Sequence, residues 1–452
     1  MRAAVFFLLP ILLAHGSAVQ AGGSQARVVP DCRDSTECRR LALDAAERRD
    51  YETFHDLAWR AVQKGPRQDP ALMYLLARAQ ALSGRPHDAL VMIQRLAEMG
   101  IASDAPTNAD FERVRTLAEW PAVAAIVERA GGGRSPADLI SSAAVSSAPE
   151  KSSPLNAAPA RGTVDQAVRI STPRFAASGL AYDAVSGRFV VGDLHGRKLI
   201  IVQDGADHAV DLVGAASAGF HEIRAIEIDT RQGDLWVATA TADDQRWSLH
   251  RLQLVSGRPL KTLPIDTALG SMKLVDLAVT PSGSVLALDA AGKRLLELRP
   301  KATNLEPVVA LAIDKPTSLA ATNDGAVYVA GAGDLQRIDL RNRTASHVSV
   351  PRDVESAEIE RIRWYDDALL ALVRGTDGTR RLVRLELNSS GRAATAATLI
   401  DRTIPANAGA VFTTVSGDYL SYVLSDAGPS GPAETSSTAG TEEFVVRRIR
   451  LR

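Results

Sequence analysis

The sequence has only two cysteines among 452 residues, and its charges nearly cancel. The 52 Lys and Arg residues are matched by 53 Asp and Glu residues, so the formal net charge is −1. A general nucleic-acid binder needs a basic face that releases counterions, and no dense Lys/Arg cluster appears. The sequence therefore predicts no nucleic-acid partner. It also predicts no transmembrane segment, because no apolar run reaches the roughly 20 residues that a spanning helix needs.

Common catalytic signatures are missing as well. The sequence contains no G-x-S-x-G elbow, no H-E-x-x-H, no P-loop and no G-x-G-x-x-G between a strand and a helix. The eight histidines are scattered without the spacing of metal ligands. What is present is an ordinary globular composition, 46% hydrophobic, on a chain long enough for two or three folded units.

Residues 1–21 have the composition of a secretory signal peptide. They read MRAAVFFLLPILLAHGSAVQA, in which one Arg precedes an apolar stretch and Val19 and Ala21 occupy the cleavage positions. A buried N-terminal helix is the alternative, and Pro10 and Gly16 disfavour it. We therefore expect a secreted or periplasmic protein.

The two cysteines, Cys32 and Cys38, follow closely in the segment DCRDSTEC. In an oxidising compartment such a pair favours a disulfide, because two thiols with no neighbouring His or second Cys pair cannot complete the four ligands of zinc. Two free thiols, or an attachment point, stay possible alternatives.

Residues 32–130 show helical periodicity. Apolar side chains recur at helical spacing, and short breaks near Gly65, Gly84 and Gly100 divide the segment into antiparallel helices. Two copies of the pattern begin 35 residues apart, at Ser35 and Pro70. A third, degenerate pair of helices is expected before residue 130.

This repeat resembles the tetratricopeptide repeat (TPR), a helix-turn-helix unit of about 34 residues. Ala77 and Ala89 stand where a small residue lets the two helices of a unit approach, whereas Phe54 takes the small position in the first copy. The resemblance implies a surface that contacts a protein or peptide partner. Packing of a short array on the neighbouring domain is the alternative.

Residues 131–165 are rich in Ala, Ser, Pro and Gly and poor in large apolar residues. Such a segment cannot bury enough surface to offset its ordering entropy. We expect a disordered linker, and hence a helical domain that is free to reorient.

From residue 166 to 452 the apolar period changes from that of helices to that of strands, with Gly and Asp turns between short runs. Six similar cycles occur, and their first residues are Gly179, Ala225, Asp276, Ser318, Arg361 and Ala410. Six like-spaced strand repeats favour a six-bladed β-propeller over a β-sandwich. The fold class is thus a short TPR-like helical array, a flexible linker and a six-bladed propeller.

The two ends of the propeller segment also suggest how the ring closes. A strand at Ala167–Ser171 precedes the first cycle, and the last strand covers Glu443–Leu451 beyond a polar loop at 427–441. We expect these two strands to pair in one blade, which would remove exposed sheet edges.

The middle-strand motifs FVVGD, LWVAT, VLALD and VYVAG resemble those of the NHL and SMP-30/gluconolactonase propellers. The SMP-30 resemblance implies one divalent cation, held by Glu, Asn and Asp side chains one residue before each inner-strand cycle. The equivalent positions here are Ser178, Arg224, Val275, Thr317, Glu360 and Gly409. Only Glu360 is an acid, and a hard cation such as Ca²⁺ needs several oxygen ligands. We therefore predict no metal, no cofactor and no catalytic residue.

The candidate binding residues lie at or next to the beginnings of the inner strands, so the ring would gather them at one mouth of the channel. They are Ser178, Arg224, Asp276, Thr317, Glu360 and Arg361. A funnel of mixed charge could bind a polar ligand or a peptide, although solvated rim charges are the commoner explanation.

The sequence thus favours an exported, non-catalytic binding or scaffold protein with a protein or peptide partner. A metal-dependent lactonase or hydrolase of the SMP-30 type, using Ca²⁺ or Zn²⁺, is the alternative. A carbohydrate-binding module of the cell envelope is a third possibility.

Overall fold

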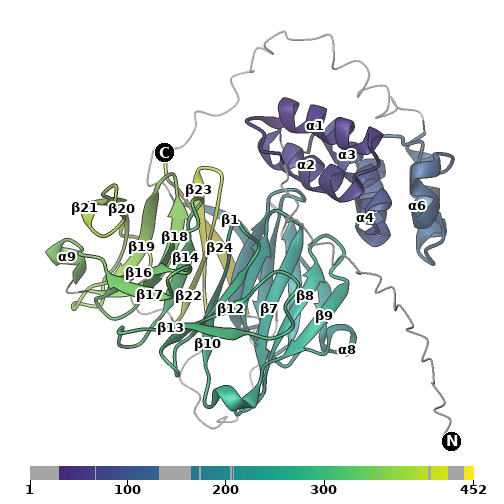
Figure 1. Cartoon of the computed structure of the whole chain (residues 1–452). Coiled ribbons are helices and arrows are strands. Elements are labelled where there is room, and N and C mark those ends of the chain that lie inside the picture. The colour runs from purple at the N-terminus through teal and green to yellow at the C-terminus, as the bar shows by residue number, and fades with distance from the viewer. Residues whose placement is uncertain are drawn as a thin grey trace, which may run out of the picture.

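The computed structural model describes residues 30–66, 68–131, 164–172, 175–203, 206, 208–355, 357–405, 409–425 and 442–452. The expected signal peptide, residues 132–163 of the expected linker and the loop at 427–441 lie outside these ranges. Figure 1 shows the two parts of the described chain, a helical region and a ring of strands. None of the described helices is long and apolar enough to cross a membrane.

The helical region contains two pairs of antiparallel helices, as the periodicity predicts. These are α1 (Ser35–Glu47), α2 (Tyr51–Lys64), α3 (Pro70–Leu82) and α4 (Pro86–Glu98). Asp34, Asp50 and Asp69 cap the first three helices by accepting backbone N–H groups of the first turn. Pro70 and Pro86 occupy the first helical position, where no N–H partner is needed. The residues up to 130 form only short elements, namely η1 (Ala109–Phe111), α5 (Glu112–Arg115) and α6 (Trp120–Arg129).

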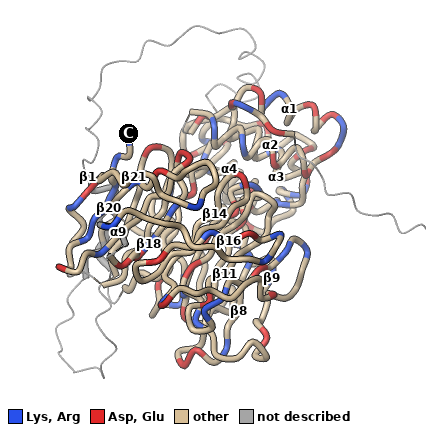
Figure 2. Tube along the Cα trace, turned by 60° about the vertical axis from the view of Figure 1, so that its left-hand side comes forward, with Lys and Arg blue, Asp and Glu red and all other residues tan. Residues whose placement is uncertain are grey.

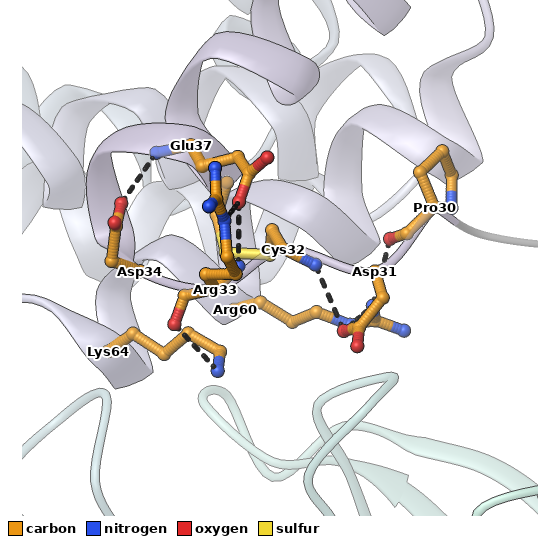
Figure 3. The surroundings of a disulfide bond; sticks show 9 residues. Pro30, Asp31, Cys32, Arg33, Asp34, Glu37, Arg60 and Lys64 are labelled. Carbon is orange, nitrogen blue, oxygen red and sulfur yellow. Dashed lines mark hydrogen bonds and ion pairs between the residues drawn. A yellow bond between two sulfur atoms is a disulfide. The ribbon is translucent and has the colours of Figure 1, made fainter.

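A disulfide joins Cys32 to Cys38 at the beginning of α1, with a Cα–Cα distance of 5.1 Å (Figure 3). Polar contacts fix the same segment to α2. Arg60 donates a hydrogen bond to the carbonyl of Pro30 at 3.1 Å, and Lys64 donates one to the carbonyl of Arg33 at 3.4 Å. The chain before α1 is therefore attached both to the first turn of α1 and to the neighbouring helix.

The strands form six four-stranded antiparallel sheets, which confirms the six-bladed propeller. Blade 1 contains β2 (Ala177–Asp183), β3 (Arg188–Asp193), β4 (Lys198–Gln203) and β5 (Ala209–Gly214). Blade 2 contains β6 (Glu222–Asp229), β7 (Asp234–Ala240), β8 (Trp247–Gln253) and β9 (Pro259–Pro264). Blade 3 contains β10 (Leu274–Val279), β11 (Val285–Asp289), β12 (Arg294–Leu298) and β13 (Glu306–Ala310).

The remaining three blades follow the same order. Blade 4 contains β14 (Ser318–Ala321), β15 (Val327–Ala330), β16 (Leu335–Asp339) and β17 (Thr344–His347). Blade 5 contains β18 (Glu358–Tyr365), β19 (Ala368–Arg374), β20 (Arg380–Leu387) and β21 (Ala394–Asp401). Blade 6 contains β22 (Val411–Ser416), β23 (Tyr419–Leu424), β24 (Glu442–Arg450) and β1 (Val164–Thr172). The short elements α8 (Ala215–Ala218), η2 (Thr267–Leu269) and α9 (Arg352–Glu355) lie between strands.

The ring closes in blade 6, as the sequence predicts. Strand β1 pairs antiparallel with β24, so that Val168 lies opposite Val446. Both side chains are buried in the cluster that joins blade 6 to blade 1. The first strand of the propeller therefore becomes the outer strand of the last sheet, and this pairing closes the ring.

The apolar core lies between successive blades. The middle strands are the most buried, and in β19 every residue from Ala368 to Val373 is buried. Each interface buries the side chains of two facing sheets, as expected for a propeller in which a blade alone cannot cover its own faces. The inner strands surround the central axis and therefore determine which side chains meet there.

The helical region packs against blades 1 and 2, so the expectation of a freely reorienting domain is not what the structure shows. One apolar cluster runs from the helices into both blades. Asp88 accepts the backbone N–H of Ser256 at 3.0 Å, and Arg95 donates to the carbonyl of Ser186 at 2.9 Å. The composition of residues 131–165 does not reveal that the surfaces of the helical region and of blades 1 and 2 pack together.

Charge is distributed evenly over the molecule. Figure 2 shows Lys and Arg interspersed with Asp and Glu along both parts of the described chain. This agrees with the near-zero net charge of the sequence. Any charged site must therefore be sought locally, in a particular pocket or pair of strands.

Candidate functional site

Four inner strands carry a β-bulge at the same point. The irregular residue is Ser178 in blade 1, Arg224 in blade 2, Val275 in blade 3 and Glu360 in blade 5. In blade 4, Thr317 lies directly before β14 and donates its N–H to Ala330 at 2.8 Å. A bulge re-aims the side chain that it carries, and bulges occur often beside functional sites. The alignment of the cycles in the sequence therefore places the candidate residues at structurally equivalent positions.

These positions open onto a very small space. A cavity of about 10 Å³ at this end of the axis is lined by Ser178, Arg224, Val275, Asp276 and others. Such a volume holds about one water molecule. The mouth of the channel is consequently filled by protein side chains in this structure.

Arg361 bonds to carbonyl groups of the inner strands near this end of the axis. Its guanidinium group lies 5.0 Å from the centre of the Phe412 ring. Its Nε donates to the carbonyl of Val411 at 2.8 Å and its Nη1 to the carbonyl of Thr317 at 3.1 Å. The side chain therefore links blade 5 to the neighbouring blades 4 and 6.

Asp276 lies at the centre of a second network. Its Oδ2 accepts hydrogen bonds from Ser318 Oγ at 2.6 Å, from the Leu319 N–H at 3.1 Å and from Arg363 Nη1 at 3.1 Å. Burial disfavours the carboxylate, but the charges of Arg363 and Arg361 outweigh it and lower the pKa of Asp276. Asp276 is thus buried and ionised, and its Oδ2 atom accepts all three of these hydrogen bonds.

Glu360 is held by two arginines of its own blade. Arg374 Nε donates to Oε1 at 2.8 Å, and Arg380 donates to Oε2 at 2.8 Å and to Oε1 at 3.0 Å. Arg380 is itself buried and also donates to the carbonyl of Gly409 at 2.7 Å. Because both carboxylate oxygens accept charge-assisted hydrogen bonds, the bidentate pair ties blade 5 to the start of blade 6.

The other candidates are engaged differently. Arg224 forms ion pairs with Asp244 at 2.9 Å and Glu222 at 2.8 Å. Thr317 Oγ1 donates to the carbonyl of Ile359 at 2.6 Å. Ser178 Oγ is buried and has no hydrogen-bond partner in the part of the chain that the structure describes. The structure thus brings the six candidates to one end of the ring. Most of their charged groups form ion pairs or hydrogen bonds with other groups of the protein.

No cluster of three or more His, Cys, Asp or Glu side chains suited to a metal ion occurs among the described residues. Glu360, the one acid at the aligned positions, is the nearest approach to a ligand. A cation at this site would have to compete with Arg374 and Arg380 for the same oxygens.

The structure also reveals two functional candidates that the sequence analysis did not single out, Glu227 and Arg363. They line a second cavity of about 170 Å³ on the axis, together with Trp364 and Thr414. Burial raises the pKa of Glu227 to about 8, against the opposing effect of Arg363. Alternate residues of a strand lie on the same face, so Arg363 shares with Arg361 one face of β18. This spacing was the signal in the sequence that could have identified Arg363.

Comparisons with known proteins give only distant likenesses. No protein-family model matches the sequence, and no curated protein does. Among solved structures, an aldose sugar dehydrogenase from Streptomyces coelicolor in its PQQ-bound form has 13% sequence identity and a TM-score of 0.43. That match covers 65% of this chain and 99% of the other.

Two further structures are similar to a comparable degree. A calcium-binding regucalcin from Agrobacterium tumefaciens has 13% identity and a TM-score of 0.43, and covers 63% of this chain and 95% of its own. A gluconolactonase from Xanthomonas campestris has 16% identity and a TM-score of 0.42, with 62% and 88% covered. These values describe a distant resemblance to propeller enzymes, and the activity of this chain has to be argued from its own side chains.

Proposed function

We propose that this chain is an exported binding or scaffold protein without catalytic activity, whose helical region and propeller each offer a contact surface. The proposal rests on the contacts that the aligned channel residues make within the protein. Both carboxylate oxygens of Glu360 accept hydrogen bonds from Arg374 and Arg380, and Arg361 donates to carbonyl groups of blades 4 and 6. These charges stabilise the ring, and they leave little space for a substrate.

Export is part of the proposal and rests on two features. The first is the signal-peptide composition of residues 1–21. The second is the disulfide between Cys32 and Cys38, since disulfides persist in oxidising compartments. Both features support the proposed secreted or periplasmic location.

We propose a protein or peptide partner because the sequence of the helical region resembles the TPR, and its helices α1 to α4 form two antiparallel pairs. Ala77 and Ala89 are fully buried where α3 and α4 approach each other, as expected for the small positions of such a unit. Stacked helix pairs of this kind present side chains to a partner on one face. The TPR identity of the region belongs to this proposal.

The test asks whether Ca²⁺ or Zn²⁺ binds and supports hydrolysis. The full chain would be thermally denatured with and without each ion, and a panel of lactones and esters would be assayed under the same conditions. We expect no ion-dependent rise in the melting temperature and no turnover.

Two variants make the result specific to the aligned site. Glu360→Gln removes the one acid at the aligned positions, and Glu358→Gln neutralises an exposed acid on the same strand. Metal-dependent turnover that Glu360→Gln abolishes and Glu358→Gln preserves would establish the hydrolase and overturn the proposal.

A further inference from the structure

A large cleft lies where the helical region meets the propeller. Its volume is about 790 Å³, within the range of roughly 300–1,000 Å³ that is typical of ligand sites. One wall contains Glu52 and Asp56 of α2 and Arg85 just before α4, and the opposite wall belongs to blades 2 and 3. Pockets between domains are preferred places for binding, because both bodies contribute polar groups to one ligand.

The propeller wall of the cleft is strongly basic. Its cationic side chains are Arg231, Arg251, Lys261, Arg299 and Lys301. The acid on this wall, Asp229, is buried, and burial raises its pKa above the ordinary value. Cations thus outnumber acids among the residues that line this wall, although Arg251 is paired with Asp234, and Arg299 with Glu297 and Glu306.

Two of these cations are well placed to meet a ligand. Lys261 is an exposed residue of β9 that pairs with Arg251 of β8 through the backbone, and its side chain has no hydrogen-bond or ion-pair partner among the described residues. The Arg299 side chain is 52% exposed, and its two ion pairs, with Glu297 and Glu306, are both 3.4 Å long. Exposed pairs of this kind contribute little and exchange easily for another carboxylate.

Another cation of this wall, Arg251, is held in place by its neighbours. Arg251 donates to Asp234 Oδ2 at 2.7 Å and to Gln232 Oε1 at 2.8 Å. Its guanidinium group lies 5.9 Å from the centre of the Trp236 ring. The cleft thus combines an arginine held by several contacts with the exposed cations Lys261 and Arg299.

The charges on the helical wall limit the class of ligand that the cleft can bind. Glu52 and Asp56 are acids, and Arg85 is already paired with Glu52 at 3.3 Å. A polymer with one negative charge per unit would face repulsion along this wall. A peptide carries its charges on separate side chains, so an acidic segment can put its carboxylates against blades 2 and 3 and its neutral or basic groups against α2.

We propose that this cleft binds an acidic peptide segment of a partner protein, with Lys261 and Arg299 as its main carboxylate contacts. This inference rests on the proposed binding function and names its partner class. It also gives the docked arrangement of the helical region a role, because the site is incomplete without both parts.

The test is a binding titration on the full chain. The probe is a fluorescein-labelled decapeptide of alternating Glu and Gly, followed by fluorescence anisotropy at fixed salt. We expect saturable binding, and at least a tenfold loss of affinity in the double variant Lys261→Glu/Arg299→Glu. Thermal denaturation would verify that this variant folds, which its exposed positions favour.

A matched control separates the cleft from general charge effects. Arg341→Glu reverses an exposed cation in the turn after β16 of blade 4, away from the cleft, and should leave the affinity unchanged. Equal loss in both variants, or no loss in the double variant, would overturn the proposed site.

Two further probes define the ligand class. The matching Lys-Gly decapeptide should not bind. A hexamer of galacturonate that bound as tightly as the acidic peptide would overturn the peptide assignment in favour of an anionic glycan. Absence of any binding would overturn the inference while leaving the non-catalytic proposal standing, since the metal and lactone assays decide that separately.

Discussion

Glu227, on the axis of the ring, should make the stability of the folded protein depend on pH. Glu227 lies in the axial cavity with Arg363, and burial raises its pKa to about 8. The folded state therefore holds a proton that the unfolded chain releases at lower pH. Stability falls as the pH rises from the ordinary Glu value towards 8, because the unfolded state then binds fewer protons than the folded state.

The variant Glu227→Gln should remove this dependence. We expect urea denaturation to show a more stable variant than wild type at pH 9, with little difference at pH 5. Glu358→Gln, at an exposed position, should follow wild type at both values. A variant that is no more stable than wild type at pH 9 would show that Glu227 ionises in the folded protein at little cost.

Gly233 allows the helical region to approach blade 2 closely. It lies in the turn between β6 and β7 with φ of 68°, and a Cβ built there would lie 2.9 Å from the Trp59 ring. Only glycine permits both this backbone conformation and the close approach of α2. The turn of blade 2 is thus shaped to receive the helical region.

The variant Gly233→Ala should therefore lose more stability than backbone strain alone explains. Gly325→Ala is the matched control, because Gly325 has φ of 87° in the corresponding turn of blade 4 and a Cβ there would meet nothing within 4 Å. We expect a loss of about 1 kcal/mol in the control and a larger loss in Gly233→Ala, measured by denaturant midpoint. Equal losses would mean that Trp59 moves aside freely.

Among the elements, α1 depends on the segment that precedes it. The disulfide closes a loop with a sequence separation of 6 between Cys32 and Cys38. By the chain-entropy argument, closing so short a loop contributes about 2 kcal/mol. Arg60 and Lys64 add hydrogen bonds that hold the same segment on α2.

Replacing both cysteines with alanine should lower the stability of the helical region by about that amount. Circular dichroism at a helical wavelength would follow the thermal transition, and dithiothreitol added to wild type should reproduce the shift. An unchanged transition in both cases would place the stability of the region in its helix packing alone.

At the scale of the whole molecule, Asp88 links the docking of the two parts to pH. It is 2% exposed and accepts the backbone N–H of Ser256, and burial raises its pKa to about 7. Arg85 opposes this shift and Asp234 adds to it. The docked state therefore holds a proton between the ordinary Asp pKa and about 7, so docking weakens as the pH rises through that range.

We expect the radius of gyration from small-angle X-ray scattering to be larger at pH 8.5 than at pH 5.5. Asp88→Asn keeps a carbonyl oxygen for the Ser256 N–H and has no charge, so its radius should be the same at both values. A wild-type radius that does not change with pH would show that the interface holds Asp88 as a carboxylate.

The sequence by itself determined the elements and their order. Hydrophobic periodicity distinguishes helix from strand, and six similar cycles specify six blades, because each pattern reflects which faces a segment must bury. It also determined that Ser178, Arg224 and Glu360 occupy equivalent positions, since the bulges fall where the cycles align.

Only the tertiary structure decided what those positions do. That Glu360 meets Arg374 and Arg380, that Arg361 bonds to blades 4 and 6, and that α2 faces blades 2 and 3 across a cleft all depend on which strands and helices come together. Composition and periodicity report burial, which is a property of each segment. Charge pairing and domain docking depend on which surfaces meet, and folding alone brings them together.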